Sequence, residues 1–222
     1  KCVEIDPDMM EAQLTLANIY LLARDFEKSR EKAEMILEKE PDNVTARLIL
    51  ANGYAGGKEI DKGIAEAKKA VEIDPGRIPS YLNLGSLYLM NKDVESAEKT
   101  LKDALKIDPN SIPVHLALSR LYLAGRRWKK AEEEFALTVR IDPGNIMLKL
   151  NLANFHRSRG DAGKAKETYL TIIKAAPEEV GPRLLLADLY ESAGKRKEAI
   201  KEYQKTLEIK PDHIIAELKL VE

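Results

Sequence analysis

Ile73-Asp74-Pro75, Ile107-Asp108-Pro109 and Ile141-Asp142-Pro143 are copies of one tripeptide, spaced 34 residues apart. A further copy stands at 5–7, and weaker copies keep the proline but change the residues before it. The prolines at this spacing are Pro7, Pro41, Pro75, Pro109, Pro143, Pro177 and Pro211. Self-similarity at one fixed period is the signature of a protein built from stacked structural repeats. The interval therefore decides the architecture, although it does not identify a ligand.

The prolines also set the boundaries of the repeats. When each proline is given position 32, six full repeats cover 10–43, 44–77, 78–111, 112–145, 146–179 and 180–213. Residues 1–9 are then a partial repeat, and residues 214–222 begin another. We therefore expect a single array over 1–222. Because the chain opens at Lys1 inside a repeat, without a methionine, we also expect it to be a piece of a longer protein.

Each repeat carries two apolar patterns of helical period. The first covers about positions 1–14 and has leucine at position 7 and mostly tyrosine at position 11, as in Leu84 and Tyr88. The second covers about positions 17–30, for example Trp128 to Ile141, and the following proline ends it. Glycines near position 14 or 15 predict a left-handed helix C-cap between the two helices. These glycines are Gly57, Gly125, Gly160 and Gly194.

Two positions are small in every full repeat, one in each predicted helix. Position 8 is Ala17, Ala51, Gly85, Ser119, Ala153 and Ala187. Position 20 is Ser29, Gly63, Ala97, Ala131, Ala165 and Ala199. Paired small residues predict that the two helices of a repeat approach closely, since a bulky side chain there would overpack the contact.

With these residues the sequence resembles a tetratricopeptide repeat (TPR) array over its whole length. The sixth repeat meets the family pattern with Leu186-Ala187, Tyr190, Ala199, Tyr203 and Pro211. The third repeat meets it except at position 24, where Leu101 replaces an aromatic residue. The resemblance implies an all-α fold, a right-handed α-solenoid of antiparallel helix pairs in which the first helices line the concave side. Each repeat then contacts only its neighbours.

Two departures from the family pattern affect the expected packing. The bulky aromatic residue of position 4 appears only as Tyr81, and the other repeats have Gln13, Arg47, His115, Lys149 and Arg183. The second repeat has Gly63 at position 20 and Ala67 at position 24. Glycine weakens a helix and alanine fills little space, so we expect the second helix of this repeat to be the least well packed.

Charge and composition exclude several classes of partner. Lys plus Arg is 36 and Asp plus Glu is 37, a formal net charge of −1, which disfavours nucleic acid as a partner. The basic run 126–130 is followed by three glutamates, which neutralise it. No apolar run has the length of a membrane span, so we expect no membrane insertion within these residues. Cys2 is the only cysteine, so no internal disulfide forms and the compartment stays unknown, cytoplasmic or periplasmic.

No catalytic or metal-binding set emerges from the sequence. The histidines are His115, His156 and His213, and no two are four residues apart as a zinc pair on a helix requires. His156 stands at position 11, where the other full repeats have tyrosine, and is expected to pack in the core. Gly57-Lys58 lacks the spacing of a phosphate loop and is expected to form a turn. We expect no enzyme activity, no cofactor and a structural role for Cys2.

The first helices carry the candidate binding face, at positions 2, 6, 9 and 13. Only three of these 24 positions are charged, although the chain's charged fraction of 33% would give about eight. Position 5 is always leucine, which either packs against the next repeat or forms an apolar wall of the groove. Asparagines at positions 6 and 9 resemble those with which relatives bind peptide main chains. The predicted groove residues are Leu48, Asn52, Leu82, Asn83, Ser86, Leu116, Arg120, Leu150, Asn151, Asn154 and Arg157.

These observations lead to two functional hypotheses of different classes. The first is a scaffold that binds a largely uncharged peptide or helical segment of a partner protein in the groove. In it, Arg120 and Arg157 together hold one carboxylate or carbonyl group. The second is a structural spacer that associates end to end, because residues 214–222 begin an apolar helix with no second helix to cover it. An enzyme with an unrecognised site is a distant third.

Overall fold

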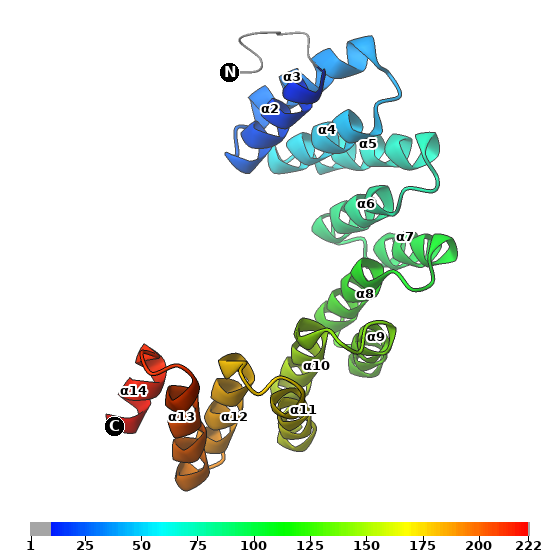
Figure 1. The fold of residues 1–222 in the computed structure, drawn as a ribbon. Helices are drawn as coiled ribbons and strands as arrows, with labels where there is room; N and C mark the ends of the chain where they lie inside the picture. The colour runs from blue at the N-terminus through cyan, green and yellow to red at the C-terminus, as the bar shows by residue number, and fades with distance from the viewer. Residues whose placement is uncertain (1–9, 222) are drawn as a thin grey trace. The chain divides into compact units, whose positions relative to one another are not determined.

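The computed structural model describes residues 10–221, and these fold into helices joined by short turns, with no strand among them (Figure 1). The fold is all-α, and consecutive helices pack as antiparallel pairs within 10–127 and within 128–221. The first helices of the repeats are α2 (Met10–Leu22), α4 (Val44–Gly56), α6 (Ile78–Met90), α8 (Ile112–Ala124), α10 (Ile146–Ser158) and α12 (Val180–Ser192). The second helices are α3 (Phe26–Lys39), α5 (Ile60–Ile73), α7 (Val94–Ile107), α9 (Trp128–Ile141), α11 (Ala162–Ala175) and α13 (Arg196–Ile209), and α14 (Ile214–Val221) follows them.

The predicted helix boundaries are confirmed in every full repeat. First helices run from position 1 to 13 and second helices from position 17 to 30. The second helices begin with aspartate caps in three repeats: the side chains of Asp25, Asp93 and Asp161 accept hydrogen bonds from backbone N–H groups of the first turn. The helices end before the repeat prolines, which lack the N–H donor that a longer helix needs.

The turn within each repeat has its left-handed residue at position 15. Gly160 and Gly194 are there, with φ of 78° and 70°, as expected from their sequence. The prediction for Gly57 and Gly125 is wrong, because they lie at position 14 with φ of −77° and −82°. In each turn the N–H of position 16 donates a hydrogen bond to the carbonyl of position 11. This bond closes the turn and requires the left-handed conformation at position 15. In the first four repeats this residue is Arg24, Lys58, Lys92 or Arg126.

In the first, second, third, fifth and sixth repeats, the small residues of positions 8 and 20 lie at the contact between the two helices of the repeat. Ser29 donates a hydrogen bond to the carbonyl of Ala17, with 2.9 Å between Oγ and O. In the second repeat the approach is so close that a Cβ at Gly63 would lie 2.7 Å from the carbonyl oxygen of Ala51. Ala67 is fully buried, and Ile64 joins it in the core. The expected poor packing of α5 is therefore not found, because close backbone approach replaces bulk.

Four residues of different types at position 4 form the same hydrogen bond, each to the carbonyl of a repeat proline. Tyr81, His115 and the two arginines Arg47 and Arg183 each bind the carbonyl of the proline six residues earlier, at distances between 2.6 and 3.5 Å. Arg47 also pairs with Glu66 at 2.8 Å. The departure from an aromatic residue at position 4 therefore preserves a bond between each of these first helices and the preceding loop.

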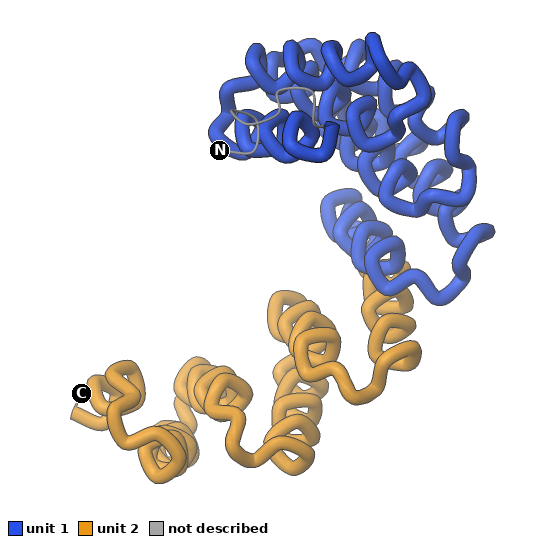
Figure 2. The backbone as a smooth tube through the Cα atoms, turned by 45° about the horizontal axis from the view of Figure 1, so that its top comes forward, with its two compact units in different colours: residues 1–127 blue, residues 128–222 orange. Residues whose placement is uncertain are grey.

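The chain divides into two compact units, Lys1–Arg127 and Trp128–Glu222 (Figure 2). The core of the first contains a cluster around Ala51, Ala67 and Leu84, and that of the second contains one around Ala153, Tyr169 and Leu186. The single array over 1–222 stays a prediction. Among the described residues, no helix is long and apolar enough to span a membrane. Cys2 and the other residues of 1–9 lie outside the described part of the chain.

Candidate functional site

The first helices α6 and α8 present a nearly uncharged surface. Their sequences contain one charged residue, Arg120, apart from the histidine His115, which is buried. The two helices are neighbours within the first compact unit (Figure 1). Charged side chains are usually abundant on a face that meets only water, so this surface has the composition of a binding face.

A pocket of about 450 Å³ opens between α6 and α8, with Leu101 of α7 contributing to its wall. We call it the α6–α8 pocket. Its lining is mostly apolar, with one hydroxyl group and one guanidinium group, which is the composition typical of ligand sites. The lining residues are Leu82, Gly85, Ser86, Leu89, Leu101, Pro113, Leu116, Ala117 and Arg120. Four of them, Leu82, Ser86, Leu116 and Arg120, are among the predicted groove residues.

The pocket lies where the third repeat has a leucine and a glycine. Leu101 at position 24 is buried against Gly85 at position 8, where a Cβ would be 3.1 Å from the leucine side chain. In the fifth repeat the same position is Tyr169, and its hydroxyl reaches the groove face and donates to Oδ1 of Asn154 at 3.2 Å. Leu101 is too short to reach Ser86, the corresponding groove residue. The space that tyrosine fills elsewhere is therefore left open beside α6.

Arg120 is available for a ligand. Its side chain is exposed at position 9 of α8, and it makes no hydrogen bond or ion pair with any residue between 10 and 221. Its neighbour Arg127 differs, because it forms an ion pair with Glu98. A guanidinium group binds carboxylates through charge-assisted hydrogen bonds, which are stronger than neutral ones.

The predicted asparagines of the first unit bind each other. Asn83 Nδ2 donates to Asn52 Oδ1 at 2.9 Å, and both side chains are half-buried between α4 and α6. Oδ1 of Asn83 has no partner among the described residues. Asn83 is a predicted groove residue, and the structure adds a structural role, because its replacement would remove a bond between two repeats. Leu48, on α4, is half-buried.

Family models for the tetratricopeptide repeat match residues 7–78, 54–111, 88–147 and 150–214, most of the chain. The chain belongs to the tetratricopeptide repeat family. TPR proteins typically mediate protein–protein interactions and are usually not catalytic. No match was found among the curated proteins.

Solved TPR structures share the fold at low sequence identity. The Pseudomonas aeruginosa pilF structure has a TM-score of 0.65 and 19% identity, over 94% of this chain and 95% of that one. YrrB, described as a TPR protein with an unusual peptide-binding site, has a TM-score of 0.54 and 17% identity, over 84% and 96%. The APC/C Cut9–Hcn1 hetero-tetramer has a TM-score of 0.62 and 17% identity over 99% of this chain, which spans 44% of that one.

Two of the four TPR groove residues predicted in the second unit, Leu150 and Asn154, are engaged in its own packing. Leu150 packs on the cluster of Ala153, Tyr169 and Leu186, and Asn154 accepts the tyrosine hydroxyl. Asn151 is half-buried and Arg157 is exposed. Because Arg157 and Arg120 belong to different compact units, their joint binding of one carboxylate stays a prediction.

The leucines of TPR position 5 divide between the two roles considered for them. Leu14, Leu150 and Leu184 pack against core clusters, which is the structural role. Leu82 and Leu116 instead line the α6–α8 pocket. Position 5 therefore lines the pocket in the third and fourth repeats and packs against the core in the first, fifth and sixth.

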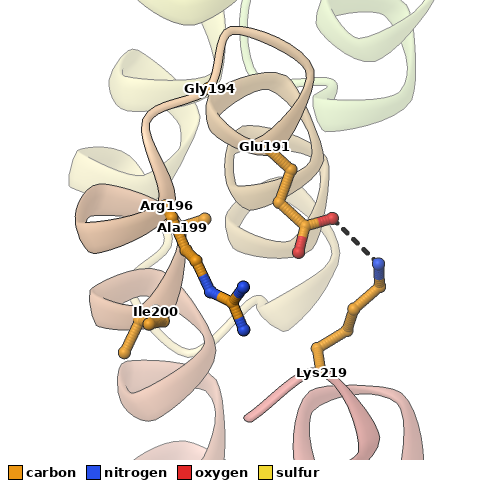
Figure 3. A pocket seen from close by; sticks show the side chains of 6 residues that line it. All are labelled: Glu191, Gly194, Arg196, Ala199, Ile200 and Lys219. Atoms are coloured by element: carbon orange, nitrogen blue, oxygen red, sulfur yellow. Dashed lines mark hydrogen bonds and ion pairs between the residues drawn. The ribbon is translucent and has the colours of Figure 1, made fainter. Parts of the chain in front are cut away.

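A second, smaller pocket of about 250 Å³ lies among α12, α13 and α14 (Figure 3). Glu191 and Lys219 form an ion pair across it at 2.9 Å, and Arg196 extends beside them. Gly194, Ala199 and Ile200 complete its lining. No sequence pattern indicated this pocket, since its residues come from three helices and only Lys219, at position 6 of the partial repeat, is at a groove position. Its charges are already paired in part, so it is a weaker ligand site than the α6–α8 pocket.

The remaining sequence candidates have structural roles. His156 is buried, and burial lowers its pKa, as expected for a core histidine. Trp128 is half-buried, and the guanidinium of Arg159 lies 4.1 Å from its ring centroid. Lys58 takes the left-handed position of a turn, as expected for the Gly57-Lys58 pair. Over residues 10–221, no group of three or more acidic, histidine or cysteine side chains is placed to hold a metal ion.

Proposed function

We propose that this TPR chain is a non-enzymatic scaffold that binds an extended or helical segment of a partner protein along its first helices. The observation that carries the proposal is the α6–α8 pocket, an apolar hollow with one unpaired cation on a face otherwise free of charge. Covering such a surface removes apolar area from water, which favours binding. The surface also offers few charged groups whose desolvation would oppose binding.

Solved relatives support this class of function. The YrrB structure is described by its peptide-binding site, and the Cut9–Hcn1 and Naa15/Naa10–HypK structures are complexes with other proteins. The second repeat extends the same face, because Asn52 is half-buried beside Asn83 and has an amide N–H group for a ligand carbonyl.

A photo-crosslinking amino acid tests the proposal. Placed at Ser86, it reports on the groove face, and placed at Lys99, on the exposed face of α7, it serves as the control. We expect a partner from the source cell to crosslink through position 86 and not through position 99, and the crosslinked segment to map to one stretch of the partner. Crosslinking mainly through position 99 would instead assign binding to the second helices.

A second candidate function, end-to-end association, is supported by α14. Ile214, Ile215 and Leu218 expose 70, 57 and 61% of their surface, and Val221 exposes 87%. Leu220 differs, because it packs half-buried on the cluster around Tyr203. Sedimentation equilibrium of the chain and of a Leu218→Glu variant tests this function. Concentration-dependent self-association that the substitution abolishes would support it, and a monomer in both cases would exclude it.

A further inference from the structure

The size of the α6–α8 pocket indicates what enters it. In protein cores, a void of about 150 Å³ is enough to hold a benzene ring. The pocket has about 450 Å³, so it accommodates an aromatic side chain together with the main chain that carries it. Its walls include Leu82, Leu89, Leu101 and Leu116, and they provide an apolar surface on several sides of a ring. Aromatic side chains bury more area than other residues and often dominate the energy of an interface.

The charge around the pocket indicates what accompanies the ring. Helices α4, α6 and α8 contain no aspartate or glutamate, and their only charged residues are Arg47 and Arg120. Arg47 is paired with Glu66, whereas Arg120 has no partner among the described residues. A carboxylate beside the ring therefore meets one attractive cation and no repelling anion from these helices. A basic side chain there would be repelled by Arg120 and would find no acidic partner on these helices.

We propose that the α6–α8 pocket recognises an aromatic side chain next to an acidic one in the partner segment. The ring enters the pocket, and the carboxylate accepts hydrogen bonds from the guanidinium of Arg120. This specificity rests on the proposed function, and it narrows the expected, largely uncharged segment to one with an acidic side chain beside an aromatic one. It also confines the main anchor to the third and fourth repeats, because the pocket is lined by residues 82–120 alone.

Selection from a displayed library of random peptides, with the whole chain as bait, tests this specificity. We expect the enriched peptides to share an aromatic residue beside aspartate or glutamate. One enriched peptide is then synthesised in four forms: unchanged, with the aromatic residue replaced by alanine, and with the acidic residue replaced by asparagine or by lysine. Affinity should fall at least about tenfold for the first two replacements and further for lysine.

Two variants of the chain examine the pocket and the cation separately. Leu101→Tyr fills the pocket from its inner wall, as Tyr169 does in the fifth repeat, without changing any exposed groove residue. Arg120→Glu reverses the charge at an exposed position. Arg140→Glu, at an exposed position of α9, is the matched control. We expect Leu101→Tyr to abolish the preference for the ring, Arg120→Glu to favour the lysine form of the peptide, and Arg140→Glu to behave as wild type.

The outcomes separate this inference from the proposed function. If peptides bind but lack the aromatic–acidic pair, or if Arg120→Glu does not reverse the preference, the inference is wrong. Groove binding would still stand if Met90→Arg or Met147→Arg, at exposed groove positions, weakened those peptides. If no peptide is enriched, or none responds to any groove substitution, both the inference and the proposed function fail. Should Leu101→Tyr prevent folding, the charge reversal at Arg120 alone decides the result.

Discussion

The second, third and fifth repeats differ in what occupies the space beside the small residue of position 8. The fifth places Tyr169 there, whose hydroxyl reaches Asn154 on the groove face. The second brings its helices so close at Gly63 that Ala67 suffices. The third has Leu101, and a pocket remains between α6 and α8. One repeat pattern therefore yields a filled groove or a hollow one, depending on a buried residue of the second helix.

Removing the side chain of Tyr169 should leave a cavity in the fifth repeat, as Leu101 does in the third, and should strongly reduce the stability of the fold. Tyr169→Ala deletes a fully buried ring, and we expect it to lower the free energy of unfolding by about 3–5 kcal/mol. Tyr169→Phe is the control: it keeps the ring and loses only the hydrogen bond to Asn154, about 1 kcal/mol. Urea denaturation followed by hydrogen exchange in α11 measures both. Equal effects of the two substitutions would mean that the ring does not fill the space.

The comparison extends to position 11, which is Tyr122 in the fourth repeat and His156 in the fifth, and we expect the two units to differ in their sensitivity to acid. Tyr122 donates a hydrogen bond to Glu98. Burial opposes the ionisation of Glu98, but hydrogen bonds from Lys102, Arg127 and Tyr122 outweigh it and lower its pKa to about 2. A carboxylate with a lowered pKa stabilises the fold above its unfolded value of about 4.5, and this contribution is lost as the pH falls from there toward 2. We expect a loss of about 2–3 kcal/mol in the first unit.

His156 makes the second unit sensitive to acid at a higher pH than Glu98 does the first. Burial lowers its pKa, so the folded state favours the neutral imidazole and loses stability as the pH falls below its unfolded value of about 6.5. As the pH is lowered from 7 to 5, the protection factors for hydrogen exchange should therefore fall in α10 before they fall in α8. His156→Tyr, which introduces the residue usual at position 11, should remove the change in α10, and Glu98→Gln should remove the change in α8 at lower pH. Simultaneous loss of protection in wild type would contradict the assignment.

The next largest effect is expected at the close contact between α4 and α5 in the second repeat. Gly63→Ala raises helix propensity, yet its Cβ would meet the Ala51 carbonyl at 2.7 Å, so we expect a loss of about 1–3 kcal/mol. Gly181, also helical, has open space where an alanine methyl group would lie, with no atom within 4 Å, so Gly181→Ala should be neutral or stabilise by up to about 1 kcal/mol. Thermal melts of both variants measure the contrast. A stabilised Gly63→Ala would show that the helices separate at little cost.

The fold was predictable from the sequence in detail because the proline spacing places every helix in one register. The candidate site was predictable only in part. Leu82, Ser86, Leu116 and Arg120 follow from the helical wheel of the first helices, but the pocket depends on Leu101, which belongs to a second helix and faces the groove from behind. The bond between Asn52 and Asn83 likewise joins two repeats, and its geometry depends on how closely α4 and α6 pack. Periodicity within one helix carries no information on such contacts.

The choice of residue at the left-handed turn position bears on how the chain behaves in concentrated solution. Arg24, Lys58, Lys92 and Arg126 occupy a backbone conformation that glycine adopts more easily, as Gly160 and Gly194 do. A residue with a side chain incurs a conformational penalty there of about 1 kcal/mol. Each of these turns instead carries an exposed positive charge. Glycine there would remove four positive charges from a chain of formal net charge −1 and leave it at about −5, so molecules would repel each other more strongly, whereas the natural residues hold the chain near neutrality.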